Sequence, residues 1–224
     1  MTGNPFESQE TVRRFARSAD IAIRTDTYTR GKLFVDLAKR NIPDGGFILD
    51  YGCGPGRISL MVAQAGYKVR GIDPSPEMIS EANSLDREGL TLDFEVGGQL
   101  ALERASYDGI LCSSVIDYVG DPDALLQAFH RSLRPGSTLV VSHGNTYSLF
   151  CLYWSHNSKV YNPFLNAVQH HWTPSAFRDL LVRNGFELTS RPRYFDPTYE
   201  RWFGSLLLGV PFVGSLSIVA ARRR

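Results

Sequence analysis

The chain of 224 residues has little cysteine and no excess of charge of either sign. Its three cysteines, Cys53, Cys112 and Cys151, match no spacing typical of metal ligands or of a disulfide framework. This pattern predicts a reduced, cytoplasmic setting and no metal site. The formal net charge of +1 gives no electrostatic reason to expect nucleic acid as a partner.

Long apolar runs are also missing. The longest, "LLLGVPFVG" at 206–214, is too short to span a bilayer and is interrupted by Gly209 and Pro211. It overlaps the segment 194–212, for which packing or contact with a substrate is favoured over peripheral contact with a membrane. The first residues lack an apolar signal region, which again favours the cytoplasm.

Short apolar runs alternate with amphipathic stretches, which predicts a doubly wound α/β sheet of parallel strands in a single domain over residues 1–224. Helices are expected within 1–44, with starts at Ser8 and Thr27, and further helices are expected to start at Ser75, Asp121 and Thr173. Pro135 and Gly136 are expected to end the helix that follows Asp121. The predicted strands are 47–51, 67–73, 90–96, 107–115 and 137–143, followed by an antiparallel pair at 186–195 and 214–223.

A glycine-rich stretch, "DYGCGPG" at 50–56, follows the first predicted strand. Its glycines, Gly52, Gly54 and Gly56, follow the spacing G-x-G-x-G, and Arg57 stands where the dinucleotide fingerprint has its third glycine. Asp50 would repel a phosphate and attract an ammonium group. The stretch therefore predicts a loop for a ligand without phosphate, and a tight turn that binds nothing is the alternative.

Asp73 ends the second predicted strand, which lies beside the first in this topology. A carboxylate at that place can accept hydrogen bonds from both hydroxyls of a ribose. The alternative is that Asp73 only caps the next turn. Met78, one turn into the following helix, suits either a purine contact or the core.

Several motifs together resemble one family. "ILDYGCGPGRIS", "GIDPSPEMI", "YDGILCSSVIDYV" and "LRPGSTLVVS" look like the successive motifs of class I S-adenosylmethionine-dependent methyltransferases, and "WTPSAFRDLLVRNGFEL" resembles the late helix and strand of that family. The resemblance implies a Rossmann-like sheet of seven strands, in the order 3-2-1-4-5-7-6 with the last strand antiparallel.

The resemblance also implies roles for single residues. Asp50 would contact the methionine amino group, Asp73 would hold the ribose hydroxyls, and Tyr28 would close over the cofactor. Family members often carry an acidic residue after the third strand for the adenine amino group, where this chain has Gly98, so Gln99 or a backbone carbonyl would serve. The implied cofactor-binding residues are Asp50, Gly52, Gly54, Gly56, Asp73, Pro74, Met78, Gly98, Gln99, Ser113 and Ser114.

An aromatic insertion at 144–172 follows the fifth predicted strand and is longer than a plain crossover needs. A cover over an apolar acceptor is one interpretation, and a satellite core or a dimer contact is another. Candidate bases are His143, His170 and His171, because histidine titrates near neutral pH. Candidate acceptor contacts are Asp117, Tyr118, Tyr147, Trp154 and Trp172.

These features predict an S-adenosylmethionine-dependent methyltransferase that moves a methyl group to an oxygen or nitrogen of a small-molecule or lipid-like metabolite. S-adenosylhomocysteine would be its product. The alternatives are a nicotinamide-dependent oxidoreductase, a methyltransferase for nucleic acid or protein, and a cofactor-binding protein without catalysis. A monomer or homodimer is expected, without nucleic acid as partner.

Overall fold

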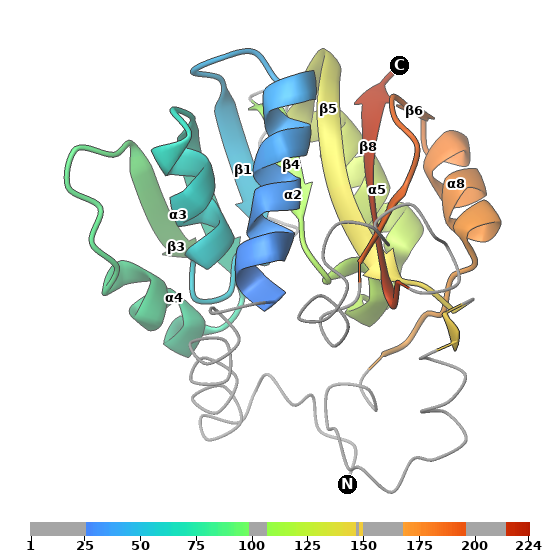
Figure 1. Cartoon of the computed structure of the whole chain (residues 1–224), viewed down its shortest axis with the longest axis horizontal. Helices are drawn as coiled ribbons and strands as arrows, with labels where there is room; N and C mark the ends of the chain where they lie inside the picture. The colour runs from blue at the N-terminus through green and yellow to red at the C-terminus, as the bar shows by residue number, and fades with distance from the viewer. Residues whose placement is uncertain (1–25, 99–106, 147, 150–167, 196–213) are drawn as a thin grey trace, which may run out of the picture.

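The computed structural model describes residues 26–98, 107–146, 148–149, 168–195 and 214–224, and it forms one twisted sheet with helices on both faces (Figure 1). The strands run in the order β3-β2-β1-β4-β5-β8-β6. The short strand β7 also pairs with β8 and stands outside this order. Their bounds are β1 Phe47–Tyr51, β2 Lys68–Asp73, β3 Leu92–Val96, β4 Tyr107–Cys112, β5 Leu133–Gly144, β6 Phe186–Leu188, β7 Arg193–Phe195 and β8 Leu216–Arg223.

The helices connect the strands in the manner of βαβ units. Their bounds in the described residues are α2 Asp26–Asn41, α3 Arg57–Gln64, α4 Pro76–Asn83, the 3-10 turn η3 Ile116–Tyr118, α5 Pro122–Ser132 and α8 Pro174–Arg183.

The pairing confirms the predicted topology. Strands β3, β2, β1, β4 and β5 pair in parallel, so their carboxyl ends meet at one edge of the sheet. β8, the last strand, runs antiparallel beside β5, with His143 opposite Ser217. This is the predicted order with an antiparallel final strand, and it places the ligand edge beyond β1, β2, β4 and β5.

The predicted strand 186–195 is wrong as a single element. It forms two short strands, β6 and β7, which pair with different parts of β8. Pro192 lies between them and has no N–H to give to a ladder, so pairing cannot run without a break through this position.

Three of the predicted helix starts are confirmed by side-chain caps. The side-chain oxygens of Ser75, Asp121 and Thr173 accept hydrogen bonds from backbone N–H groups three residues later, at 3.3, 2.9 and 3.1 Å. A proline follows each cap at the first helical position, where its missing N–H costs nothing.

Two helix ends differ from the prediction. α2 begins at Asp26, one residue before the predicted cap Thr27. α5 ends at Ser132, before Pro135 and Gly136, because Leu133 already has an extended backbone with ψ 146° and opens β5. Pro135 and Gly136 therefore lie inside β5, where the register against β4 shifts.

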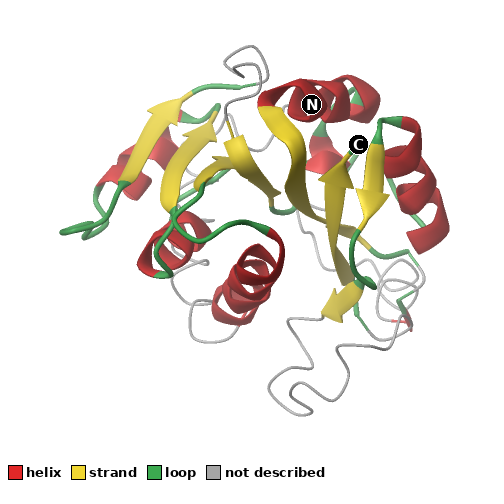
Figure 2. Cartoon of the chain, turned by 90° about the horizontal axis from the view of Figure 1, so that it is seen from above, coloured by secondary structure: helices red, strands yellow, loops and turns green. Residues whose placement is uncertain are grey.

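Two layers of core form because side chains alternate across the buried strands. Ile48 and Val140 pack on one face with α2 and α3, and Leu49 and Val141 pack on the other face with α5 and α8. All four side chains are fully buried. Figure 2 shows the sheet between these two helical layers.

Some predicted segments lie outside the described residues. They include the helix expected after Ser8, most of the 144–172 insertion and most of 194–212. The single-domain prediction for 1–224 stays a prediction. Among the helices that the structure describes, none has the length and apolar character needed to cross a membrane.

Candidate functional site

The glycine loop between β1 and α3 uses backbone conformations that favour glycine. Gly52, Gly54 and Gly56 have φ angles of 69°, 53° and 75°. A Cβ added to Gly52 would lie 2.3 Å from Cγ2 of Val115, so the loop packs tightly against the segment after β4. A Cβ on Gly54 would meet no atom within 4 Å. Glycine is thus favoured at position 52 for two reasons, the positive φ angle and the lack of space for a Cβ atom.

The N–H groups of this loop are already used by the protein. Gly52 and Cys53 donate to the Ile72 carbonyl at 2.8 and 3.0 Å, Gly54 donates to Oδ2 of Asp73 at 3.0 Å, and Gly56 donates to the Cys53 carbonyl at 3.0 Å. Loops that bind phosphate offer such N–H groups to the ligand. The geometry therefore agrees with the prediction of a ligand without phosphate at this loop.

Asp50 lies at the end of β1 and is 1% exposed. Its Oδ2 accepts a hydrogen bond of 2.5 Å from the Ser59 hydroxyl on α3. Its Oδ1 is buried and has no hydrogen-bond partner in the part of the chain that the structure describes. Burial raises the pKa of Asp50 to about 6, against the lowering effect of Ser59. A cationic donor at Oδ1 would satisfy this atom and hold the carboxylate in its charged form.

Asp73, at the end of β2, is fixed by the backbone on both sides. Oδ2 accepts from Gly54 N–H, and Oδ1 accepts from Ser75 N–H at 2.9 Å. Burial raises its pKa, and these two hydrogen bonds oppose the shift. Each oxygen keeps a second lone pair, so Asp73 braces the next turn and can still accept hydrogen bonds from a ribose. The two interpretations of Asp73 are compatible.

The residues expected beside the adenine are placed as follows. Pro74 is exposed, and Met78 is 2% exposed, so the Met78 side chain packs inside the protein. Gly98 follows β3 and its Cβ position is open. Gln99 lies outside the described residues. Adenine contacts stay a prediction.

The turn after β4 has a second irregular backbone. Ser114 has φ 55°, a left-handed conformation that is uncommon for a residue with a side chain. Its N–H donates to the Ser142 hydroxyl on β5 at 2.8 Å, and Arg30 on α2 donates to its hydroxyl at 3.3 Å. The hydroxyl of Ser113 is buried without a hydrogen-bond partner. The two serines therefore follow β4, which ends at Cys112 and not at 115 as predicted, and they lie near Gly52 through Val115, while their cofactor role stays a prediction.

Sequence reasoning missed several residues of this edge. Ser59 supports Asp50 from α3, and Arg30 and Ser142 support Ser114 from α2 and β5. None belongs to the glycine motif. Ser59 alone had a usable signal, since it lies in the first turn of the helix that the motif opens.

Together with burial, three carboxylates raise the pKa values of two cysteine thiols at these strand ends. The Cys112 thiol is buried, which raises its pKa, and the charges of Asp50 and Asp117 raise it further. The Cys53 thiol is influenced in the same way by burial and then by Asp50 and Asp73. Asp50, Asp73 and Asp117 thus lie around one short stretch of the carboxyl edge, and together they favour a cationic ligand.

On the side of β4 and β5, Asp117 joins three segments. Its Oδ2 accepts from Gly144 N–H at 2.7 Å, and its backbone carbonyl accepts from Gln169 and His170 N–H at 2.8 and 3.1 Å. Burial raises the pKa of Asp117 to about 7, while the Gly144 N–H and the Trp172 indole lower it. Tyr118, its neighbour, has its pKa raised to about 12, mainly by burial and then by Asp117.

The candidate bases occupy three different environments. His143 is 1% exposed, stacks on Phe177 with ring centroids 3.9 Å apart, and bonds through Nδ1 to the Gly144 carbonyl at 2.8 Å. Burial lowers its pKa to about 4, so it is neutral at pH 7. His170 Nε2 lies 2.9 Å from the Val119 carbonyl, and its ring stacks on Trp172. His171 is exposed.

The structure brings Asp117, Tyr118, His170 and Trp172 together. Tyr147 and Trp154 lie outside the described residues, and the side chain of Tyr28 is not described, although Tyr28 belongs to α2. The roles of all these residues stay predictions.

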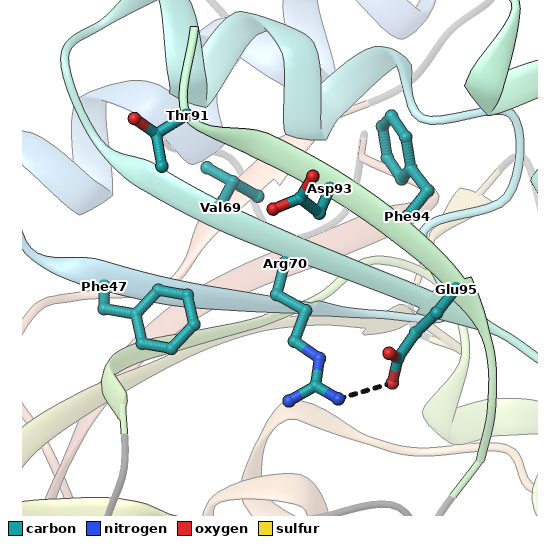
Figure 3. A pocket seen from close by; sticks show the side chains of 7 residues that line it. All are labelled: Phe47, Val69, Arg70, Thr91, Asp93, Phe94 and Glu95. Carbon is teal, nitrogen blue, oxygen red and sulfur yellow. Dashed lines mark hydrogen bonds and ion pairs between the residues drawn. The ribbon is translucent and has the colours of Figure 1, made fainter.

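A shallow hollow lies elsewhere on the sheet, and Figure 3 shows Arg70 pointing toward Glu95 inside it. The Arg70 Nη2 atom lies 2.7 Å from Glu95 Oε1. The hollow contains none of the predicted site residues, and it is lined by Phe47, Val69, Arg70, Thr91, Asp93, Phe94 and Glu95.

A family model described as a methyltransferase domain matches residues 24–191. This match covers most of the chain, including every strand from β1 to β6. The chain belongs to this methyltransferase family. The predicted methyltransferase family is thereby confirmed, and the methyl donor and the reaction of the whole protein are taken up as proposals below.

Similar proteins extend this result. A protein of Xanthomonas axonopodis pv. citri named ubiquinone biosynthesis O-methyltransferase is 36% identical over 110 residues, which is 47% of this chain and 46% of that protein. This chain therefore spans about half the length of the curated relatives that it matches.

Two solved methyltransferase structures share the fold. One is a Thermotoga maritima S-adenosylmethionine-dependent methyltransferase described as a possible histamine N-methyltransferase, with TM-score 0.69, 18% identity, and coverage of 96% of this chain and 98% of that one. The other is the Synechocystis magnesium protoporphyrin IX methyltransferase with bound S-adenosylhomocysteine, with TM-score 0.65, 21% identity, and coverage of 88% and 83%.

Proposed function

We propose that this methyltransferase moves a methyl group from S-adenosylmethionine to an oxygen or nitrogen of a small-molecule or lipid-like acceptor by direct displacement. The observation that carries the proposal is the pair Asp50 and Asp73 beside a glycine loop whose N–H groups are already bonded within the protein. Such a loop offers carboxylates instead of amide N–H groups. It suits a cationic nucleoside without phosphate better than a dinucleotide.

The residues present fit this cofactor. Asp50 has one buried oxygen without a partner, which would accept from the methionine ammonium group. Asp73 would accept from the ribose hydroxyls through its remaining lone pairs. When bound, the cofactor supplies an activated methyl group on a positively charged sulfur. Asp50, Asp73 and Asp117 contribute negative charge near that cation, while burial limits screening by solvent.

In this proposal, the protein contributes to catalysis mainly by aligning the acceptor atom with the methyl group. Displacement requires the acceptor atom in line with the methyl group, and positioning alone contributes roughly 7–11 kcal/mol in well-oriented reactions. In this proposal, residues 1–224 form one domain with the acceptor beyond the ends of β4 and β5. The name of the Xanthomonas relative, which concerns ubiquinone, supports an acceptor that is small or lipid-like.

Titration calorimetry tests the cofactor part of the proposal. We expect the wild-type protein to bind S-adenosylmethionine and S-adenosylhomocysteine, and to bind NAD far more weakly. Asp73→Ala removes two charge-assisted hydrogen bonds to the ribose, so we expect affinity to fall about 100-fold. Asp93→Ala is the matched control, because Asp93 is an exposed carboxylate on the neighbouring strand β3.

Circular dichroism of each variant separates loss of affinity from loss of folding. Unchanged affinity in Asp73→Ala would contradict the ribose role. Tight binding of NAD alone by the wild type would contradict the proposed function. Transfer of a radiolabelled methyl group to a panel of quinol, polyketide, sugar and amine acceptors then tests catalysis.

A further inference from the structure

Among the described residues, the buried polar atoms without a hydrogen-bond partner include two that lie near each other at the β4–β5 side of the carboxyl edge. They are Oδ1 of Asp117 and Nε1 of Trp172. The first is a hydrogen-bond acceptor when ionised, and the second is a donor only. Buried polar groups without partners are uncommon and costly in native proteins, so this pair calls for a chemical explanation.

Both side chains are held firmly in place. Asp117 is 5% exposed and is fixed through Oδ2 by the Gly144 N–H. The Trp172 carbonyl accepts from the N–H and hydroxyl of Thr146, at 3.2 and 2.9 Å. The indole packs edge-on against Phe177, with ring centroids 5.9 Å apart. The two unpartnered atoms are therefore positioned by the fold and not by loose side chains.

The two groups are near each other without forming a hydrogen bond. The Trp172 indole lowers the pKa of Asp117 as a weak hydrogen-bond donor would, yet Nε1 and Oδ1 do not reach the geometry of an ordinary hydrogen bond with each other or with another described group. One group that both donates and accepts would satisfy both atoms together.

A hydroxyl group meets this demand during methyl transfer, and an amine does not. A hydroxyl has one hydrogen for Asp117 and two lone pairs. One lone pair can accept from Trp172 while the other attacks the methyl carbon. An amine nitrogen has a single lone pair, which the attack itself uses, so Trp172 Nε1 would stay unsatisfied.

We propose that Asp117 and Trp172 bind a hydroxyl group of the methyl acceptor and that Asp117 removes its proton, an inference that rests on the methyltransferase function proposed above. The hydroxyl oxygen forms a bond to the methyl carbon as the carbon–sulfur bond breaks. The sulfur keeps that electron pair and becomes a neutral thioether. The hydroxyl proton passes to Asp117 Oδ1. Trp172 donates to the oxygen throughout and orients it.

The position of Asp117 relative to the cofactor residues supports this role. Asp117 and Asp50 both act on the Cys112 thiol at the end of β4, so the acceptor pair lies beside the predicted methionine site. A pKa of Asp117 near 7 suits a proton acceptor at neutral pH. The titratable or charged groups around it are Cys112 of β4, Tyr118 of η3, Arg30 of α2, His143 of β5 and His170.

The test uses the full chain with S-adenosylmethionine and radiolabelled methyl transfer. The probes are phenol, catechol and a primary alcohol, each beside the matched amine. The variants are Asp117→Asn, which keeps the shape of the side chain, and Trp172→Phe, which keeps an aromatic ring and removes the indole N–H. Asp179→Asn on the exposed surface of α8 is the matched control.

We expect methylation of hydroxyl probes only. Asp117→Asn should lower turnover by about 100-fold, the lower range for loss of a general base, and should abolish the rise of turnover with pH through about 7. Trp172→Phe should lower turnover by about tenfold, in line with one lost hydrogen bond, and should keep the pH profile. Calorimetry should show unchanged cofactor affinity in Trp172→Phe and in Asp179→Asn, and in Asp117→Asn a loss of affinity smaller than that of Asp73→Ala.

Three outcomes would overturn the inference. They are methylation of amines alone, no methylation of any hydroxyl probe by a protein that binds the cofactor, and an unchanged pH profile in Asp117→Asn. If the two side chains serve only the fold, both variants will change the unfolding midpoint and leave turnover at saturating acceptor as in the wild type. Failure of the wild type to bind the cofactor would instead refute the proposed function.

Discussion

The carboxyl edge of the sheet has two ends that are built differently. At the β1–β2 end, the deciding contacts join residues close in sequence: Asp50 with Ser59, nine positions away, and Gly54 with Asp73, nineteen positions away. At the β4–β5 end, Asp117 bonds to Gly144, 27 positions away, and Gln169 bonds to Tyr118, 51 positions away. The first end is a local motif, and the second is an assembly of separate segments.

The two ends also differ in which polar groups they leave without a hydrogen-bond partner. At the cofactor end, Asp73 has both oxygens bonded to backbone N–H groups and the loop N–H groups are all used, while Oδ1 of Asp50 has no partner among the described residues. At the acceptor end, Oδ1 of Asp117 and Nε1 of Trp172 have no such partner. The cofactor end thus leaves a carboxylate acceptor for a cation, and the acceptor end leaves an acceptor and a donor together.

The largest expected effect comes from Gly52→Ala, which tests whether the local motif depends on the distant segment. The new Cβ would lie 2.3 Å from Val115 in a left-handed backbone. We expect a loss of about 2–5 kcal/mol in unfolding free energy, from about 1–2 for the conformation and about 1–3 for overpacking. Urea denaturation measures it.

Gly54→Ala is the matched control for Gly52→Ala. Gly54 also has a positive φ, but its Cβ would meet no atom within 4 Å, so only the conformational cost of about 1–2 kcal/mol remains. Val115→Ala added to Gly52→Ala should recover the packing part alone. Equal losses in Gly52→Ala and Gly54→Ala would show that the two ends are not sterically coupled.

A smaller effect on the free energy of unfolding is expected for Asp117→Asn. Its sign follows from the raised pKa of the Asp117 carboxyl. The pKa of Asp117 rises from 3.8 to about 7 in the folded protein. Stability from this group is therefore full below pH 3.8 and is lost as pH rises through 7. The shift corresponds to at most about 4 kcal/mol, and we expect Asp117→Asn to be about 1–3 kcal/mol more stable than wild type at pH 8.5.

The difference between Asp117→Asn and wild type should shrink as pH falls and should vanish below about pH 3.8, where the carboxyl is protonated in both the folded and the unfolded protein. Thermal or urea denaturation at both pH values measures it, with Asp179→Asn as the exposed control. A variant less stable than wild type at pH 8.5 would mean that the charged carboxylate is fully satisfied within the fold. The acceptor end would then resemble the cofactor end.

The smallest expected effect concerns Asp50→Asn and cofactor affinity. Burial raises the pKa of Asp50 to about 6 in the free protein, so a cationic ligand binds more tightly once the carboxylate ionises. We expect wild-type affinity for S-adenosylmethionine to rise about tenfold from pH 5 to pH 7, since one pKa unit corresponds to a tenfold change. Asp50→Asn should bind about tenfold more weakly at pH 7 and show no such rise.

Calorimetry across that pH range measures the effect, and Asp93→Asn serves as control. If the rise with pH persists in Asp50→Asn, another group contacts the ammonium, and the role implied for Asp50 is wrong. In that case the unpartnered oxygen of Asp50 needs a different explanation.

Much of the fold was predictable because its signals are local. Proline after Ser75, Asp121 and Thr173 marked three helix starts, and apolar runs marked the strands whose parallel order the structure confirms. The helix ends at Asp26 and Ser132 and the division of 186–195 were not predictable to the residue. They depend on which backbone groups find partners in neighbouring strands.

The candidate site divides in the same way. The sequence indicated Asp50, the glycine loop and Asp73, since they belong to two short motifs at the ends of neighbouring predicted strands. Arg30 and Ser142 were missed because each reaches Ser114 across a gap that the fold alone closes, and Ser59 was missed although it lies in the first turn of the helix that the glycine loop opens. The family match agrees with the predicted cofactor class and leaves each residue role to experiment.

The sequence by itself determined the alternation of strands and helices, three helix caps and the glycine loop, because hydrophobic period, capping and backbone freedom act within a few residues. Only the tertiary structure decided that Asp117 and Trp172 lie together, each with one atom unsatisfied. It also decided that His143 is buried and neutral, stacked on Phe177. Burial and long-range hydrogen bonds set the charge and partners of these groups, and both depend on segments far away in the chain.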